Sequence, residues 1–244
     1  MTRLLSIIAL VIFWAIAAAL VHSRMLPGPA AVASEIVTDT GSGELPFEMG
    51  CTLARVIVSF TIALVFGSLA GFAMGRWKVA DRYGDPWLVV LLNLPALVTI
   101  IFAYIWIGLT DTAAILAVAL NKLPNVVVVM REGTRTLDQG LDEMARAFRL
   151  AGFARMRHVV IPQLAPYFAA ASRSGLSIAW KIVLVAELIG RPNGVGFVLG
   201  SAFSLFDLTR ILSYALTFVA LMLSIENLLV QPLERRVQRW RRRA

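Results

Sequence analysis

Five ionisable side chains stand inside long apolar stretches of the sequence, and they are the residues best placed to do chemistry. They are Lys122, Arg173, Lys181, Glu187 and Glu226. A charge at the depth of a lipid bilayer costs at least about 2.5–3.5 kcal/mol, so such residues are usually paired or line a cavity. The chemistry that these residue types offer is therefore ion pairing and the capture of an opposite charge.

The residues that usually carry bond-making or metal chemistry are isolated in this sequence. The single cysteine, Cys51, excludes an internal disulfide and a cysteine-based metal site. The two histidines, His22 and His158, have no partners at metal-ligand spacing, and no Gly-x-x-x-x-Gly-Lys-Ser/Thr phosphate loop occurs. We therefore expect no metal, no cofactor held by this chain and no enzymatic activity of its own.

The composition indicates a membrane protein. Of the 244 residues 59% are hydrophobic and only 16% are charged, with a mean hydropathy of +0.77, whereas about a quarter of the residues of a soluble domain are charged. A net charge of +8 would suggest a nucleic-acid partner in a soluble protein. Here the basic residues lie between apolar stretches, as membrane topology requires, so we expect no nucleic-acid partner.

The apolar stretches predict an all-α membrane protein of about six transmembrane helices, forming a single domain over 1–244. Uncharged stretches of about 18 or more residues are typical of bilayer spans. The expected spans are 4–22, 51–75, 86–108, 112–131, 166–190 and 211–231. We read the first as a retained helix and not as a signal peptide. In the second span Gly67, Gly71 and Gly75 share one face, which allows another helix to pack closely.

The distribution of basic residues predicts the orientation. With a cytoplasmic N-terminus, the inside segments hold sixteen of the 23 lysines and arginines. The outside segments then hold four, namely Arg24, Arg55, Arg191 and Arg210. Because cytoplasmic loops carry the excess of positive charge, we expect both termini to be cytoplasmic.

The segment 132–162, between the expected fourth and fifth spans, is polar and helical in pattern. It contains Glu143-Met144-Ala145-Arg146-Ala147-Phe148-Arg149, followed by Val159, Ile161 and Pro162. Met144, Ala147, Phe148 and Ala151 recur at i, i+3, i+4 and i+7 and form one apolar face. Such a helix can dock in a groove of a soluble partner, or it can rest on the lipid interface.

This segment resembles the EAA loop of ABC importer permeases, written E-A-A-x-x-x-G-x9-I-x-L-P. Glu143 and Ala145 take the first and third places of the pattern, and Pro162 takes the last. Met144 replaces the middle alanine, and Arg149 stands where the family usually has the glycine that lets the helix end. The sequence therefore leaves the length of this helix open, with one further turn as an alternative. The resemblance implies that the helix docks on an ATPase and couples it to transport.

The resemblance extends over nearly the whole chain and favours the nitrate/sulfonate/taurine-type branch of these permeases. Further matching stretches are Ala179-Trp180-Lys181, Ala186-Glu187, Gly194-Val195-Gly196, Leu26-Pro27-Gly28-Pro29, Trp106-Ile107-Gly108-Leu109 and 231–236 with Trp240. It implies a subunit of the bacterial inner membrane that pairs with a second permease, by default another copy of itself. It also implies two ATPase subunits, which bind ATP and magnesium, and a periplasmic or lipid-anchored binding protein.

The loop 190–207 and the intramembrane charges are the expected transport elements. The loop, with Asn193, Gly194 and Gly196, is long for a connector, so we expect a re-entrant gate on the periplasmic side, with a plain connector as the alternative. Arg173 and Glu226 lie at similar depth and are expected to form a structural ion pair. Glu187 is expected to pair with Arg191 or to cap the gate.

The remaining charges predict the nature of the solute. Arg173, Ser177 and Lys181 share one helix face, Lys122 lies near mid-membrane, and Trp180 precedes Lys181. Neither lysine has an acid at its own depth, which favours an oxyanion such as nitrate, a sulfonate or a carboxylate. A neutral heterocycle, or lysines paired with a neighbouring helix, stays an alternative. A secondary transporter or channel is the rival function; it often shows internal repeats of broken helices, and no convincing repeat is visible here.

Overall fold

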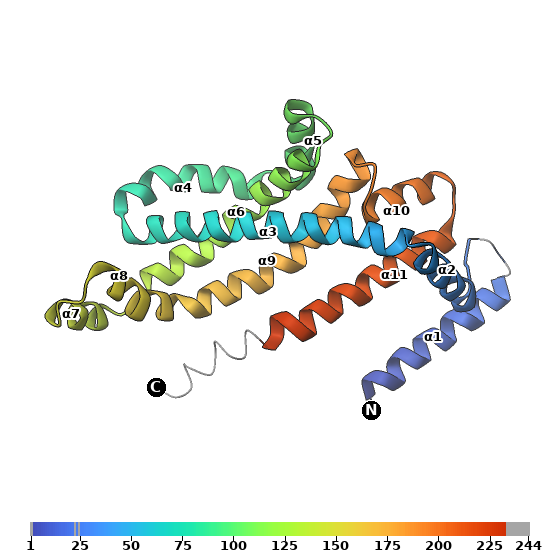
Figure 1. Cartoon of the computed structure of the whole chain (residues 1–244), viewed down its shortest axis with the longest axis horizontal. Coiled ribbons are helices and arrows are strands. Elements are labelled where there is room, and N and C mark those ends of the chain that lie inside the picture. The colour runs from blue at the N-terminus through green and yellow to red at the C-terminus, as the bar shows by residue number, and fades with distance from the viewer. Residues whose placement is uncertain (1, 22, 24, 233–244) are drawn as a thin grey trace. The chain divides into compact units, whose positions relative to one another are not determined.

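The computed structural model describes residues 2–21, 23 and 25–232, and these residues are helical with no β-strand. The chain divides into two compact units, Met1–Ala54 with Leu184–Leu223, and Arg55–Val183 with Ser224–Ala244. Figure 1 shows the order of the helices along the chain. The expected all-α membrane fold is therefore confirmed.

The first unit contains short and long helices from both ends of the chain. These are α1 (Thr2–Val21), α2 (Pro29–Ser42), the start of α3 (Glu44–Arg76), the end of α9 (Ile161–Gly190), α10 (Val195–Ser204) and α11 (Leu208–Ile225). Pro29 opens α2 because its fixed φ suits the first helical turn. Gly43, with φ +83°, ends the same helix in the left-handed region.

The second unit is built around α6. It holds the rest of α3 and α9, together with α4 (Lys78–Asn93), α5 (Ala96–Ile107), α6 (Asp111–Arg135), α7 (Gln139–Ala147), α8 (Gly152–Arg155), η1 (Met156–Val160) and η2 (Glu226–Val230). The α6 side chains Val126 and Met130 form a buried cluster with Val160, Leu164 and Ala171. Burial of such apolar surface is the main stabilising contribution to this unit.

Glycines bring α3 and α6 into close contact, as their spacing predicted. A methyl group added at Gly67 would lie 2.7 Å from the Val126 Cβ, and one at Gly71 would lie 2.6 Å from the Val127 carbonyl oxygen. A methyl group at Gly75 would lie 2.4 Å from the Thr134 Cβ. Any larger residue would therefore push the two helices apart.

The expected span 86–108 is not one straight helix. The structure places α4 and α5 there, bent by 99° at the break between them. The physical reason is Pro95, which caps α5 and keeps Leu94 in the extended region, at ψ 122°. Of the helices in the described residues, four are long and apolar enough to span a membrane, or up to five if the bent pair is one span.

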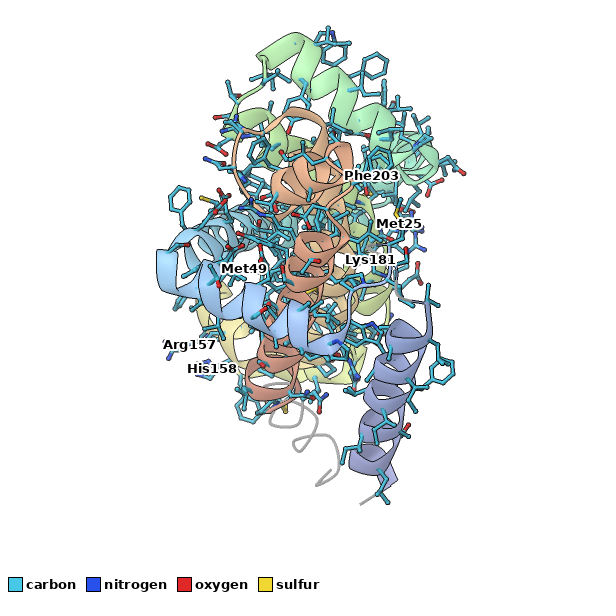
Figure 2. All side chains as sticks on the ribbon, turned by 90° about the vertical axis from the view of Figure 1, so that its right-hand side faces the viewer. Met25, Met49, Arg157, His158, Lys181 and Phe203 are labelled. Carbon is cyan, nitrogen blue, oxygen red and sulfur yellow. The ribbon has the colours of Figure 1, made fainter. Side chains whose placement is uncertain are left out.

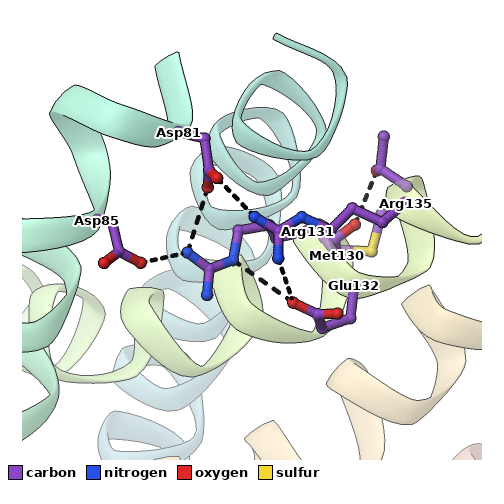
Figure 3. Close-up of polar contacts among 7 residues, drawn as sticks. Asp81, Asp85, Met130, Arg131, Glu132 and Arg135 are labelled. Atoms are coloured by element: carbon purple, nitrogen blue, oxygen red, sulfur yellow. Dashed lines mark hydrogen bonds and ion pairs between the residues drawn. The ribbon is translucent and has the colours of Figure 1, made fainter. Parts of the chain in front are cut away.

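An ion-pair network fixes the start of α4 against the end of α6 (Figure 3). Arg131 Nη1 lies 2.5 Å from Asp85 Oδ1 and 3.3 Å from Asp81 Oδ1. Arg135 Nη2 lies 2.6 Å from the other oxygen of Asp81, and its Nη1 lies 3.1 Å from Glu132 Oε1. The network satisfies both α4 acids within the second unit.

Candidate functional site

The segment expected to couple to an ATPase forms a nine-residue helix, α7. Asp138 caps its N-terminus, since its Oδ1 accepts the Gly140 N–H at 2.7 Å. The Asp138 N–H in turn donates to Gln163 Oε1 at 2.9 Å, which ties the start of α7 to the start of α9. Asp142 forms ion pairs with Arg146, at 2.9 Å, and with Arg155 of α8.

These partners set the charge of Asp142. Burial would raise the pKa of the Asp142 carboxyl, but the hydrogen bonds and positive charges of Arg146 and Arg155 outweigh burial and hold this pKa below its ordinary value. Asp142 is therefore ionised at neutral pH. Its contact with Arg155 joins α7 to α8, and its contact with Arg146 lies within α7.

The helix ends at Ala147, so the alternative of a further turn is wrong. Arg149 adopts φ +52°. Its N–H bonds the Arg146 carbonyl at 2.9 Å, and the Leu150 N–H bonds the Ala145 carbonyl, also at 2.9 Å. This pair of bonds is the Schellman arrangement that normally uses glycine. Arg149 thus takes the left-handed conformation at the very position where the family pattern has glycine.

Large apolar side chains of α7 and its C-cap face outward, and Leu141 is 39% exposed. Met144 is 45% exposed and Phe148 is 76% exposed. The expected continuation of this face to Ala151 is wrong, because the chain turns at Arg149 and Ala151 instead caps α8. Ala145 is fully buried and packs inward, so it supports α7 from behind.

The other residues expected to take part in docking are exposed as well, apart from Ala145. Glu143, Arg146, Arg149 and Pro162 are all exposed. Arg157 and His158, exposed neighbours on η1, project away from the ribbon (Figure 2). The exposed surface of α7 thus combines apolar and charged side chains, as protein–protein interfaces do.

Lys122 of α6 is buried to 1% exposure, and its ammonium has no hydrogen-bond partner among the residues that the structure describes. Its side chain runs over Gly175 of α9: a methyl group added there would lie 3.1 Å from Lys122 Cε and 2.8 Å from Phe60 Cε2. Gly175 and Phe60 were not identified from the sequence. The one signal in the sequence was Gly175 itself, because a glycine inside an apolar helix indicates that another group approaches the backbone closely.

The other residues expected in the path differ from Lys122 in their surroundings. Trp180 is 2% exposed, whereas Arg173 and Lys181 are exposed; Figure 2 labels Lys181. The side chain of Ser177 lies outside the described residues. Glu226 begins η2 and is half-buried, and its ion pair with Arg173 stays a prediction.

The loop 190–207 contains the ten-residue helix α10. The side chain of Glu187, from the end of α9, lies against the start of this helix. The Glu187 carboxylate accepts the Gly196 N–H at 2.9 Å and the Thr52 hydroxyl at 2.8 Å. The Gly194 N–H donates to the Glu48 carboxylate. Asn193 is half-buried in the preceding turn. Glu48 and Thr52 were not identified from the sequence, because Glu48 stands in a polar segment that resembles a connector and Thr52 is a single hydroxyl at the start of an apolar span.

These features define a multi-helix membrane protein with a short exposed helix, α7. Residues 63–243 match the model of the family described as "Binding-protein-dependent transport system inner membrane component". The chain belongs to this family. It is a permease component of an ABC importer and a multi-pass protein of the inner membrane, which rules out the rival secondary transporter or channel.

Known relatives agree on the branch. The chain is 29% identical to the putative aliphatic sulfonates transport permease protein SsuC of Escherichia coli, over 96% of this chain and 89% of that protein. It is 25% identical to the E. coli taurine transport system permease protein TauC, over 96% and 86% of the two chains. It is 24% identical to the nitrate import permease protein NrtB of Synechococcus elongatus, over 78% and 72%.

Solved structures show the same fold. One chain of the inward-facing MetNI methionine ABC transporter matches with a TM-score of 0.64 and 19% identity, over 77% of this chain and 93% of that chain. One chain of an amino acid ABC transporter with histidines matches with a TM-score of 0.64 and 20% identity, over 82% and 97%. The expected permease family, its branch and its fold are thus confirmed.

Proposed function

We propose that this permease conducts a small oxyanion, such as nitrate, a sulfonate or a carboxylate, across the inner membrane. Two copies of the chain pair around the path, and each α7 docks on one of two ATPase subunits that bind ATP and magnesium. A periplasmic or lipid-anchored binding protein delivers the solute on the side of α10. Both termini are cytoplasmic, in keeping with the excess of basic residues in the segments on that side.

The exposed centre of α7 supports the docking role. Phe148 and Met144 are large, apolar and accessible, and the charged residues next to them in the chain are exposed too. Leu141, which is 39% exposed, adds a third accessible apolar side chain to α7. A short amphipathic helix of this kind can lay its apolar side chains in a groove on a folded partner.

The buried Lys122 ammonium is the observation that carries the choice of solute. A buried charge is costly unless an opposite charge or hydrogen bonds compensate for it, and this one has no hydrogen-bond partner among the described residues. An anion arriving beside Lys122 would supply that partner. Lysine is a flexible point charge and not a rigid fork, which suits transient capture. The relatives named for sulfonates, taurine and nitrate agree with this choice.

Replacing Lys122 by methionine tests the proposal, because methionine keeps the length of the side chain and removes its charge. In proteoliposomes that contain the complete importer and its binding protein, uptake of nitrate, taurine and an alkanesulfonate is measured. The solute that the wild-type complex imports should enter at least about tenfold more slowly with Lys122→Met, since tenfold corresponds to about 1.4 kcal/mol of lost attraction. Assembly and basal ATP hydrolysis should be unchanged.

Lys78→Met is the matched control, because Lys78 is an exposed lysine at the start of α4. It should import at the wild-type rate. Wild-type uptake by Lys122→Met would remove Lys122 from the path. A wild-type complex that imports a neutral heterocycle and none of the anions would overturn the choice of solute.

A further inference from the structure

Three consecutive backbone N–H groups at the start of α10 each bind a side chain of another helix, two from α3 and one from α9. The Gly194 N–H donates to Glu48 of α3, the Val195 N–H donates to the Thr52 hydroxyl at 2.8 Å, and the Gly196 N–H donates to Glu187 of α9 at 2.9 Å. The Thr52 hydroxyl also donates to Glu187 at 2.8 Å. The first N–H groups of a helix have no partner within the helix, and here side chains supply all three.

This cluster is buried. Thr52 and Glu187 are 0% exposed and Glu48 is 8% exposed. The positive end of the α10 dipole and the aligned N–H groups favour the two carboxylates at this place. Hydrogen bonds to an ionised acceptor are roughly twice as strong as neutral ones. The α10 helix has only ten residues, and so short a helix is not stable without such outside contacts.

The glycines of this turn follow from the same cluster. Gly194 has φ +103°, and a methyl group added to it would lie 2.4 Å from the Glu187 carboxyl carbon. A methyl group added to Gly196 would lie 2.2 Å from the Leu184 carbonyl oxygen. Only glycine lets the backbone of this turn approach α9 so closely. The Gly194-Val195-Gly196 sequence and Glu187 are therefore parts of one device.

We propose that Glu48, Thr52 and Glu187 form a latch that holds α10 on the last turn of α9, and that α10 must stay latched for ATP hydrolysis to be coupled to import. The proposal rests on the proposed role of α10 as the periplasmic gate. The three side chains are positioning residues: they hold the gate and do not contact the solute. Without the latch, α10 loses its fixed place and the importer hydrolyses ATP without moving solute.

Thr52 provides the sharpest test, because valine matches threonine in shape and lacks the hydroxyl, whereas serine keeps the hydroxyl. In the complete importer in nanodiscs, hydrogen exchange of the amides at 194–196 should become at least about tenfold faster with Thr52→Val and stay near wild type with Thr52→Ser. In proteoliposomes, solute imported per ATP hydrolysed should fall at least about fivefold with Thr52→Val only. Thr38→Val is the control, since the Thr38 hydroxyl donates to Ser34 within α2.

Two results would overturn the latch. One is wild-type exchange at 194–196 in Thr52→Val; the other is fast exchange with an unchanged ratio of solute to ATP. If Thr52→Val does not assemble, the same two measurements are made on Glu187→Gln. This variant keeps the side-chain shape and removes the charge. A wild-type importer that moves none of the tested anions contradicts the proposed solute alone. The latch is then still tested by comparing wild type and Thr52→Val in two measurements: hydrogen exchange at 194–196, and ATP hydrolysis stimulated by the binding protein.

Discussion

Arg149→Gly should stabilise the coupling segment. Arg149 has φ +52°, and the left-handed region costs an L-residue roughly 1–2 kcal/mol. Glycine removes that cost but loses roughly 0.5–1 kcal/mol through its greater freedom in the unfolded chain. The net gain is about 0.5–1 kcal/mol, which corresponds to a two- to fivefold slower local opening. Hydrogen exchange of the amides at 144–150, in the complete importer, measures this change directly.

Arg149→Ala separates the backbone effect from the charge. Alanine keeps the Cβ that strains the turn and removes only the guanidinium, so its exchange rates should match or exceed those of the wild type. The reasoning is refuted if Arg149→Gly exchanges as fast as the wild type, or if alanine slows exchange as much as glycine does. Either result would mean that the turn is not strained by its side chain.

Three further predictions concern docking, packing and pH. Phe148→Ala removes the most exposed α7 anchor and should weaken ATPase binding by about 2–4 kcal/mol, measured by titrating the ATPase onto the permease in nanodiscs; unchanged affinity would exclude Phe148 from the interface. Gly71→Ala places a methyl group 2.6 Å from the Val127 carbonyl oxygen and should destabilise by about 1–3 kcal/mol. Gly50→Ala in the same helix meets nothing within 4 Å and should leave the thermal unfolding midpoint unchanged or slightly higher, since alanine is less free in the unfolded chain; equal midpoints for both variants would contradict close packing of α3 on α6. The pKa of Asp142 lies below its ordinary value of 3.8 because Arg146 and Arg155 outweigh burial. Its contribution to α7 is therefore complete above pH 3.8 and is lost only as pH falls through the lower folded value. Hydrogen exchange in α7, corrected for its intrinsic pH dependence, should be constant from pH 8 to about pH 5. A change in that range that Asp142→Asn abolishes would contradict the lowered pKa of Asp142.

Much of the fold could be predicted from the sequence, because the cost of placing a charge or a bare backbone in lipid acts on each stretch separately. The apolar stretches at 51–75, 112–131 and 166–190 correspond to α3, α6 and α9, which extend beyond them by a few residues. Pro95 also indicates the break between α4 and α5, but the apolar residues on both sides of it favoured a single span over 86–108. The short helix α7 was located by its pattern of apolar residues, and its C-terminus was left open because arginine rarely takes the left-handed conformation that ends a helix here.

The sequence by itself determined the class of protein, the family, the long apolar helices α3, α6 and α9, and the position of the short helix α7. Each of these depends on residue types and spacings along one segment. Only the tertiary structure decided which buried polar groups have partners. Lys122 lies over Gly175 of another helix, and Glu48 and Thr52 meet Glu187 and the first turn of α10 across more than 130 positions of the chain. The physical reason is that a charge is compensated by whatever lies within about 3–4 Å of it, and that neighbourhood is created when distant helices pack together.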